Sequence, residues 1–524
     1  MSAKQRYDRL SSDRSQFLNT ARRAAELTLP YLVREDESYT KGNKTLITPW
    51  QSVGAKGVVT LASKLMLALL PPQTSFFKLQ VNDINLGEEL GPEIRSELDL
   101  SFAKIERTIM ESIAASGDRV VVHQALKHLV VAGNALIFMG KEGLKLYPLN
   151  RYAVDRDGNG NVIEIVTKET ISKKLVKKFY PDYKQPSTNS TSDDSSYRDD
   201  ECDIYTHVVR DNNRWVWHQE IDGNILPRSV SKAPLDANPW LVLRFNHVDG
   251  EVYGRGRVEE FIGDLKSLEA LSQAIIEGSA AAAKVVFTVS PSSTTKPATL
   301  AKAGNGAIIQ GRPDDIGVVQ VGKTADFQTA YQMIGGLTQR LNEAFLVLNV
   351  RDSERTTAEE VRMTQLELEQ QLGGLFSLLT VEFLVPYLNR KLNVAQKTGE
   401  IPRLPKGDIV KPTIVAGINA LGRGQDRESL AQFMTVIAQT IGPEAIQQFI
   451  NTDEVIKRLA ASSGIDVLNL VKSMEERQAE EQQAMGQQQQ MMAMQQEPQM
   501  AAIDQKREQA AMQMMQQQPP LPPE

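Results

Sequence analysis

The chain has 524 residues and a mass of 58.2 kDa, a length that suits about three or four domain-sized units. It is 41% hydrophobic and 24% charged, which is typical of a folded soluble protein and excludes a largely disordered one. The 59 Lys and Arg residues against 65 Asp and Glu residues give a net charge of −6. This charge argues against a protein that grips nucleic acid over its whole surface, because neutralising phosphates requires clustered cations.

The residues expected of a catalytic or metal centre are scarce. The single cysteine, Cys202, excludes a disulfide framework and any multi-cysteine metal site. Its acidic neighbours, Glu201 and Asp203, are expected to raise its pKa and weaken it as a nucleophile. None of the histidines has a Glu or a second His at ligand spacing; they are His123, His128, His207, His218 and His247. The sequence therefore predicts no catalytic residues, no metal and no cofactor.

No targeting or membrane-spanning segment is expected. The first 14 residues are polar and charged, without the apolar core of a signal peptide. The longest apolar run, 57–70, contains Lys64 and is too short to cross a bilayer. We interpret it as a buried amphipathic helix, in a protein that is cytosolic or part of a particle assembled in the cytosol.

The first half of the chain passes from helices to strands. Apolar spacing predicts an opening helix from Tyr7 to Leu29 and further helices over 52–70, 92–116 and 119–132. Period-two patterns then predict strands over 136–139, 144–147, 152–154, 162–166, 204–209, 215–218 and 240–245. The polar stretch 184–200 is expected to be a surface loop.

The second half is dominated by long helices. Helical spacing predicts one helix from Val258 to Ala283 and a second from Phe327 to Leu348, with a compact β-rich insertion over 285–320 between them. A third begins at the capping box Thr356–Glu359 and runs toward Pro386, where a kink is expected. Smaller helices are expected over 425–441, 444–450, 453–462 and 465–480, before a Gln/Met-rich tail of low complexity.

Two motif matches favour structural interpretations. Residues 317–324 fit the P-loop pattern, but Val318, Val319 and Val321 prefer extended backbone, so a strand running into a turn is the better interpretation. The turn 155–161 starts like a calcium loop but has Val166 where the pattern requires a bidentate Glu. It is therefore predicted to join two strands as a hairpin.

Two basic stretches are interpreted in the same way. The segment Tyr253-Gly254-Arg255-Gly256-Arg257 could contact phosphates, but pairing of its arginines with Glu259 and Glu260 is favoured. The lysine run 173–184 lacks interleaved aromatic residues and is interpreted as a solvated face.

The order of elements from 253 to 386 resembles the portal, or head-to-tail connector, of short-tailed phages of the podovirus type. The residues that carry the resemblance are YGRGRVEE at 253–260, GDLKSLE at 263–269, RTTAEEVR at 355–362 with Leu372-Gly373 after it, and the strand–hairpin run 133–166. The resemblance covers most of residues 1–475.

The resemblance implies a mainly α, α+β portal fold, with long stem helices bracketing a small β-containing clip, an α+β wing and a helical crown. The implied boundaries are wing 1–255, stem helix 256–284, clip 285–325, stem helix 326–348, tunnel loop 349–356, long kinked wing helix and return 357–420, crown 421–475 and tail 476–524.

The family implies a ring of identical copies, a dodecamer, at one capsid vertex of the virion. Double-stranded DNA would pass through this ring during packaging and ejection, while a separate terminase supplies the work. The implied partners are further copies of the chain, terminase, a tail adaptor, and the major capsid and scaffold proteins. No membrane is involved, and assembly takes place in the host cytoplasm.

The resemblance also suggests which cations face DNA. Arg351 and Arg355 of the tunnel loop are the predicted channel residues. Further candidates for DNA contact or for terminase or tail docking are Lys284, Lys296, Lys302, Arg312, Lys323 and Arg340. The clip carries a balance of +2, whereas the tail from residue 475 carries −5 of the total charge and leaves −1 for the body. A nearly neutral wall with a few cations suits DNA that must slide.

Two alternatives remain open at this point. An ATP-driven DNA translocase would use the P-loop match, and Lys323→Ala would then abolish its turnover. A phage scaffold or internal virion protein would instead form a non-annular helical assembly, which negative-stain microscopy distinguishes from a ring.

Overall fold

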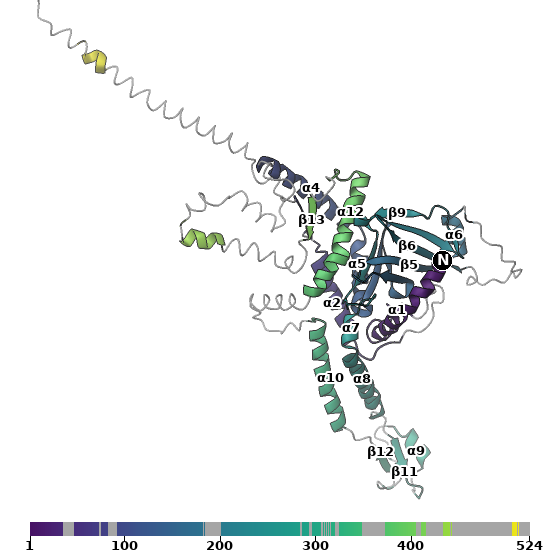
Figure 1. Cartoon of the computed structure of the whole chain (residues 1–524). Coiled ribbons are helices and arrows are strands. Elements are labelled where there is room, and N and C mark those ends of the chain that lie inside the picture. Colours follow the sequence, from purple (N-terminus) through teal and green to yellow (C-terminus); the bar gives the residue numbers. More distant parts are fainter. Residues whose placement is uncertain are drawn as a thin grey trace, which may run out of the picture. The chain divides into compact units, whose positions relative to one another are not determined.

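The structure is a computed structural model. It describes residues 1–34, 47–72, 75–81, 92–181, 183, 201–282, 286–292, 296–304, 308, 310, 312, 314, 316–319, 324–347, 373–404, 410–414, 433–440, 442, 506–510 and 512. The chain divides into two units, 1–421 and 422–524 (Figure 1). In the second unit the described residues 433–440 and 506–510 are helical. The predicted loop 184–200 and most of the predicted helices after residue 425 lie outside the described residues.

The predicted N-terminal helices are confirmed. They are α1 (Ala3–Glu26), α2 (Val53–Leu69), α4 (Pro92–Ala115) and α5 (Asp118–Ala132). α5 ends at Gly133, whose φ of 72° is the left-handed conformation that glycine adopts easily. α5 contacts α1, α2, α4 and strand β2, and its Leu129 and Val130 are fully buried. The core of the first unit is therefore centred on this helix.

Two antiparallel sheets follow α5. The first has the order β10–β2–β3, from Trp240–Arg244, Asn134–Gly140 and Gly143–Tyr147. The second has the order β4–β5–β6–β7–β8, from Tyr152–Arg156, Val162–Ser172, Glu201–Asp211, Arg214–Ile221 and Asn224–Ile225, and β9 (Ser231–Pro234) also pairs with β7. Both sheets confirm the predicted mixed α+β region. The lysine run begins α6 (Lys173–Phe179), a short helix that the sequence reading did not predict.

A small two-stranded sheet joins distant parts of the chain. β1 (Phe77–Val81) pairs antiparallel with β13 (Val410–Ile414). Neither strand was predicted, because their partners are more than 300 residues apart and neither has a hairpin turn beside it.

The predicted helix 256–284 is interrupted. The structure has α7 (Arg257–Glu260), a break at Phe261, and then α8 (Ile262–Ala282). Phe261 leaves the helical region with φ −113° and ψ 16°. The second predicted helix is α10 (Thr324–Ala344). Between them β11 (Val286–Val289) pairs with β12 (Ile316–Val319), and the insertion also contains a helix, α9 (Pro297–Lys302).

The third long helix is described only from residue 373 onward, so its predicted capping box lies outside the described residues. Helix 373–379 passes into a π-helical turn, η5 (Thr380–Leu384), and then into α12 (Val385–Thr398). A kink was expected at Pro386; the structure has a π-turn that ends at Leu384, two residues before the proline, which cannot donate a backbone hydrogen bond.

The N-terminal end of α1 is held on the second sheet by two carboxylates. Ala3 N donates to Glu220 Oε2 at 2.7 Å, and Arg6 Nε donates to both oxygens of Glu164 at 2.7 and 2.8 Å. His207 on the neighbouring strand lies 2.6 Å from Glu164 Oε1. Burial raises the pKa of Glu164, but hydrogen bonds from His207 and Arg6 outweigh it and lower the pKa to about 2 from 4.5.

Glu164 should make stability depend on pH under acid conditions. A carboxylate whose pKa is lower in the folded state contributes stability above its unfolded pKa and loses it as pH falls through the folded pKa. We expect the difference in melting temperature between the wild-type protein and Glu164→Gln to shrink as pH falls from about 4.5 toward 2. A difference that stays constant over this range would contradict the role of Glu164.

Candidate functional site

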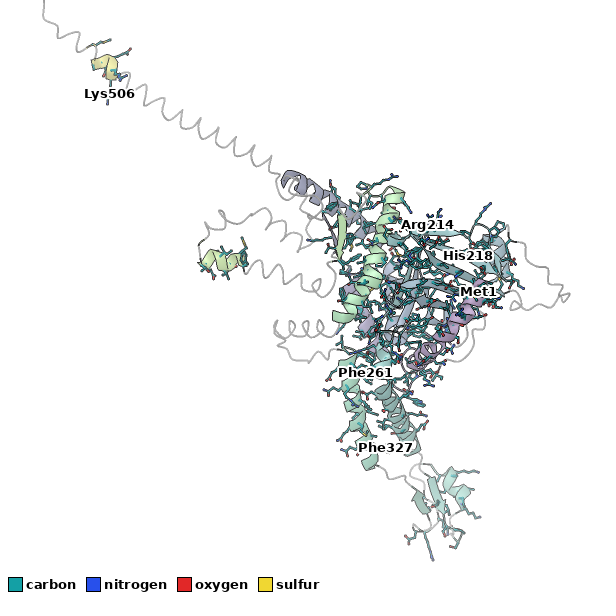
Figure 2. All side chains as sticks on the ribbon, in the orientation of Figure 1. Met1, Arg214, His218, Phe261, Phe327 and Lys506 are labelled. Atoms are coloured by element: carbon teal, nitrogen blue, oxygen red, sulfur yellow. The ribbon has the colours of Figure 1, made fainter. Side chains whose placement is uncertain are left out.

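The helices α8 and α10 pack side by side as an antiparallel pair (Figure 1). Near the body of the first unit, the rings of Phe261 and Phe345 lie 6.2 Å apart. Toward the far end, a Cβ added to Gly278 would lie 2.7 Å from the ring of Phe327, so this glycine allows the ring to pack on α8 (Figure 2). Between these contacts, side chains from both helices are buried; they are Leu265, Leu268, Leu337 and Leu341.

The same helix pair leaves large apolar side chains exposed. Ile276 on α8 is 48% exposed, and Tyr331 and Met333 on α10 are 72% and 55% exposed. Tyr331 and Met333 are two residues apart, which in an α-helix places them on different sides. The pair therefore offers more than one apolar face that the described part of the chain does not cover.

The C-terminal end of α10 meets the body at a joint that we call the α10 joint. Its residues are Gly57, Lys64, Arg257, Phe345 and Leu346. A Cβ on Gly57 of α2 would lie 2.7 Å from the ring of Phe345. Lys64 Nζ donates to the carbonyl oxygen of Leu346 at 2.5 Å. Sequence reasoning did not find this joint; the available signal was Lys64, the one charge in the apolar run 57–70.

The glycine–arginine segment before α7 is a second close contact. A Cβ on Gly256 would lie 2.7 Å from the carbonyl oxygen of Val131, and a Cβ on Gly133 would lie 2.5 Å from the backbone of Arg255. Arg255 pairs with Glu259 at 2.5 Å, and Arg257 pairs with Glu260 at 2.6 Å. The predicted pairing of both arginines with glutamates is confirmed, and the glycines allow α7 to approach the end of α5.

Comparison with known proteins identifies the protein family of this chain. Residues 1–471 match the model of the family described as bacteriophage head to tail connecting protein. The chain belongs to this family of head-to-tail connectors.

The connector also resembles curated proteins over most of its length. It is 36% identical to the portal protein of Escherichia phage T7, covering 91% of this chain and 89% of the relative. It is 31% identical to the portal protein of Enterobacteria phage SP6, covering 92% of each chain. A solved structure, the neck of an empty gene transfer agent particle computed with C6 symmetry, aligns at 10% identity over 78% of this chain and 89% of that chain, with a TM-score of 0.36. A likeness at this level adds nothing to the family assignment.

The structure describes four of the eight predicted site residues of the connector. Lys296 precedes α9 and Lys302 is its last residue; both are exposed, as is Arg312. Arg340 on α10 is 63% exposed and lies 3.5 Å from Asp264 on α8. The other four candidates, Lys284, Lys323, Arg351 and Arg355, lie outside the described residues.

The interpretation of the P-loop match as a strand is supported. Residues 317–319 belong to β12, where Gly317 pairs with Thr288 of β11 and its carbonyl oxygen accepts a hydrogen bond from Thr288 Oγ1 at 3.1 Å. An extended strand in a ladder does not turn its amides toward a phosphate. Residues 320–323 lie outside the described part of the chain.

The turn of the connector at 155–161 is a hairpin between β4 and β5, as predicted. The Asp157 carboxylate accepts hydrogen bonds from the backbone amides of Asn159 and Asn161 at 3.0 and 2.7 Å. Asp155 lies 3.3 Å from Arg6. These carboxylates therefore fasten the turn and α1, and no group of three or more potential metal ligands occurs among the described residues.

Cys202 and His128 have environments that suit structural roles. Burial, followed by the charge of Asp222, raises the pKa of Cys202 to about 11, the direction predicted for a poor nucleophile. Burial lowers the pKa of His128 to about 4, so it is neutral near pH 7. Within the described part of the connector, no helix is long and apolar enough to cross a membrane.

Proposed function

We propose that copies of this connector assemble into a ring, a dodecamer, at one vertex of the capsid, and that its channel passes double-stranded DNA during packaging and ejection. The observation that carries the proposal is the helix pair α8 and α10, whose exposed Ile276, Tyr331 and Met333 have no cover within the described chain. Apolar faces on different sides of one subunit favour a head-to-tail contact, which closes into a ring when the rotation allows it.

In this ring, α8 and α10 form the stem and the insertion between them forms the clip, on which terminase and the tail adaptor would dock. Residues 1–255 and 357–420 form the wing, and 421–475 form the crown. The major capsid and scaffold proteins are further partners of the ring. The connector itself is passive, and a separate terminase supplies the work of packaging. The exposed cations Lys296, Lys302 and Arg312 support a clip that meets acidic or phosphate-bearing partners.

The ring contact is tested at the stem. Tyr331→Lys or Met333→Lys should weaken the contact by about 1.5–3 kcal/mol at every subunit boundary, because a buried apolar side chain is replaced by a charge. We expect a shift from rings to smaller species in analytical ultracentrifugation and negative-stain images. Gln332→Lys, at the exposed position between them, is the matched control and should leave the rings intact. Intact rings in both test variants would contradict a stem contact at these residues.

The channel is tested at the proposed tunnel loop, residues 349–356. We propose that Arg351 and Arg355 contact the phosphates of DNA in transit, because Lys and Arg supply the attraction that DNA-binding surfaces need. The double variant Arg351→Ala/Arg355→Ala should form normal rings but package or retain less DNA, measured as nuclease-protected DNA per particle. Unchanged packaging and retention would show that the tunnel loop has no such role.

A further inference from the structure

α10 ends in a hydrogen-bonded Schellman motif. The amide of Leu346 donates to the carbonyl oxygen of Glu343 at 3.0 Å, and the amide of Val347 donates to that of Asn342 at 2.7 Å. This motif places one residue in the left-handed conformation, and glycine is the usual choice there. Here that residue is Leu346, with a φ of 57° and an exposure of only 9%. A buried leucine therefore holds a backbone conformation that disfavours side chains.

Two cations from other helices cap the same end. Lys64 of α2 donates to the carbonyl oxygen of Leu346, and Arg257 of α7 donates to that of Ala344 through Nε at 3.3 Å and Nη2 at 3.2 Å. The last carbonyl groups of a helix have no partner within it, and the C-terminal end carries partial negative charge. Both cations therefore fasten the end of α10 to the body of the same unit.

Packing prevents this end from sliding. The ring of Phe345 lies against Gly57, with no room for a Cβ between them, and against the ring of Phe261. The hydrogen bonds fix the backbone, and Phe345 fixes the position of the helix along α2.

Stability alone does not explain the residues chosen. Lys64 belongs to the same helix as Val58, Leu61 and Leu65, which are all fully or almost fully buried, and its own side chain is partly buried. Burial lowers the pKa of Lys64, which shows that the folded state disfavours its charge. Glycine at 346 would avoid the backbone strain. Two locally unfavourable choices at one helix end indicate a functional constraint.

We propose that Lys64 and Leu346 are positioning residues that set the direction in which the chain leaves α10 toward residues 349–356. This inference rests on the proposed function, in which those residues form the loop that contacts DNA. Leu346 lies three residues before residue 349 in the sequence, so the proposal links the direction of the chain at the end of α10 to the function of that loop.

The test is Lys64→Met in the full-length connector, incorporated into phage particles. Methionine keeps the length and the helix propensity and removes only the hydrogen-bonding charge. We expect rings and melting temperature close to those of the wild-type protein, at least about tenfold faster amide exchange at Leu346 and Val347, and less nuclease-protected DNA retained per particle. Lys266→Met, at an exposed lysine of α8, is the matched control and should change none of these.

A second variant tests the leucine. Leu346→Gly keeps the left-handed conformation and the hydrogen bonds available, but it removes the buried side chain and gives the backbone more freedom, so the chain can leave α10 in more than one direction. We expect retention to fall as in Lys64→Met, with intact rings. Unchanged retention in both variants would overturn the positioning role, as would a loss of retention that follows only from fewer rings or a lower melting temperature.

The two proposals fail in different ways. If Arg351→Ala/Arg355→Ala loses DNA while Lys64→Met and Leu346→Gly retain it, the positioning role is wrong and the channel role stands. If the double arginine variant also retains DNA, the channel role of the loop is wrong.

Discussion

Glu382→Gln is expected to destabilise the first unit by about 3–5 kcal/mol, because it leaves buried positive charge without its counter-ion. Glu382 lies in the π-turn η5 and accepts hydrogen bonds from Arg244 through the backbone N at 2.8 Å, Nε at 2.8 Å and Nη2 at 2.6 Å. Arg156 Nη1 lies 3.6 Å from the same carboxylate. Both arginine side chains are less than 10% exposed.

The π-turn explains how the glutamate reaches its partners. A π-turn inserts an extra residue into the helix and so changes which side chains face the sheet. η5 packs against β10, the strand that carries Arg244, while Arg156 comes from the end of β4. The ion cluster therefore ties the long C-terminal helix to both sheets.

Chemical or thermal unfolding monitored by circular dichroism measures this effect. Glu111→Gln is the matched control, because Glu111 pairs with Arg107 on α4 at 2.9 Å while both side chains are more than 60% exposed. Exposed pairs of this kind contribute about 0.3–0.5 kcal/mol. An equal effect of the two substitutions would show that the buried cluster is not needed for stability.

Gly133→Ala is expected to cost about 3 kcal/mol or more, because two separate penalties add at this position. The residue has a φ of 72°, and its Cβ would lie 2.5 Å from the backbone carbon of Arg255 and 2.6 Å from the carbonyl oxygen of Gly254. These neighbours are backbone atoms and cannot rotate away. The side chain of Asn134 also holds the two segments together, because its amide donates a hydrogen bond to the carbonyl oxygen of Gly254 at 2.7 Å.

Substitutions at two other glycines allow the cost of the left-handed backbone to be measured apart from the cost of the steric clash. Gly223 has a φ of 79° with open space around it, so Gly223→Ala should cost only the left-handed strain, about 1–2 kcal/mol. Gly263 in α8 has open space and no positive φ, so Gly263→Ala should be neutral or stabilise by up to about 1 kcal/mol. If Gly133→Ala costs no more than Gly223→Ala in thermal unfolding, the close approach of α5 and the segment before α7 is wrong.

The sequence predicted elements well where local patterns decide them. α2, α4 and α5 follow from apolar spacing, and β4 and β5 follow from alternation around the turn 155–161. The break at Phe261 was missed because the apolar spacing continues unbroken through Val258, Phe261 and Leu265. A tertiary contact lies at this break: Arg257 of α7 donates to the carbonyl oxygen of Ala344 at the end of α10.

The features of the functional site also fall into two groups, those set by neighbours along the chain and those set by long-range contacts. The sequence alone determined the order of the long helices and of most strands, and the near-neutral body with cations in the insertion. It also determined the pairing of Arg255 and Arg257 with glutamates four and three residues away, because this depends on neighbours along the chain. Only the tertiary structure decided that Lys64 reaches Leu346, 282 residues later, and that β1 pairs with β13. Such contacts depend on where the packed core places distant segments, and no local periodicity records that placement.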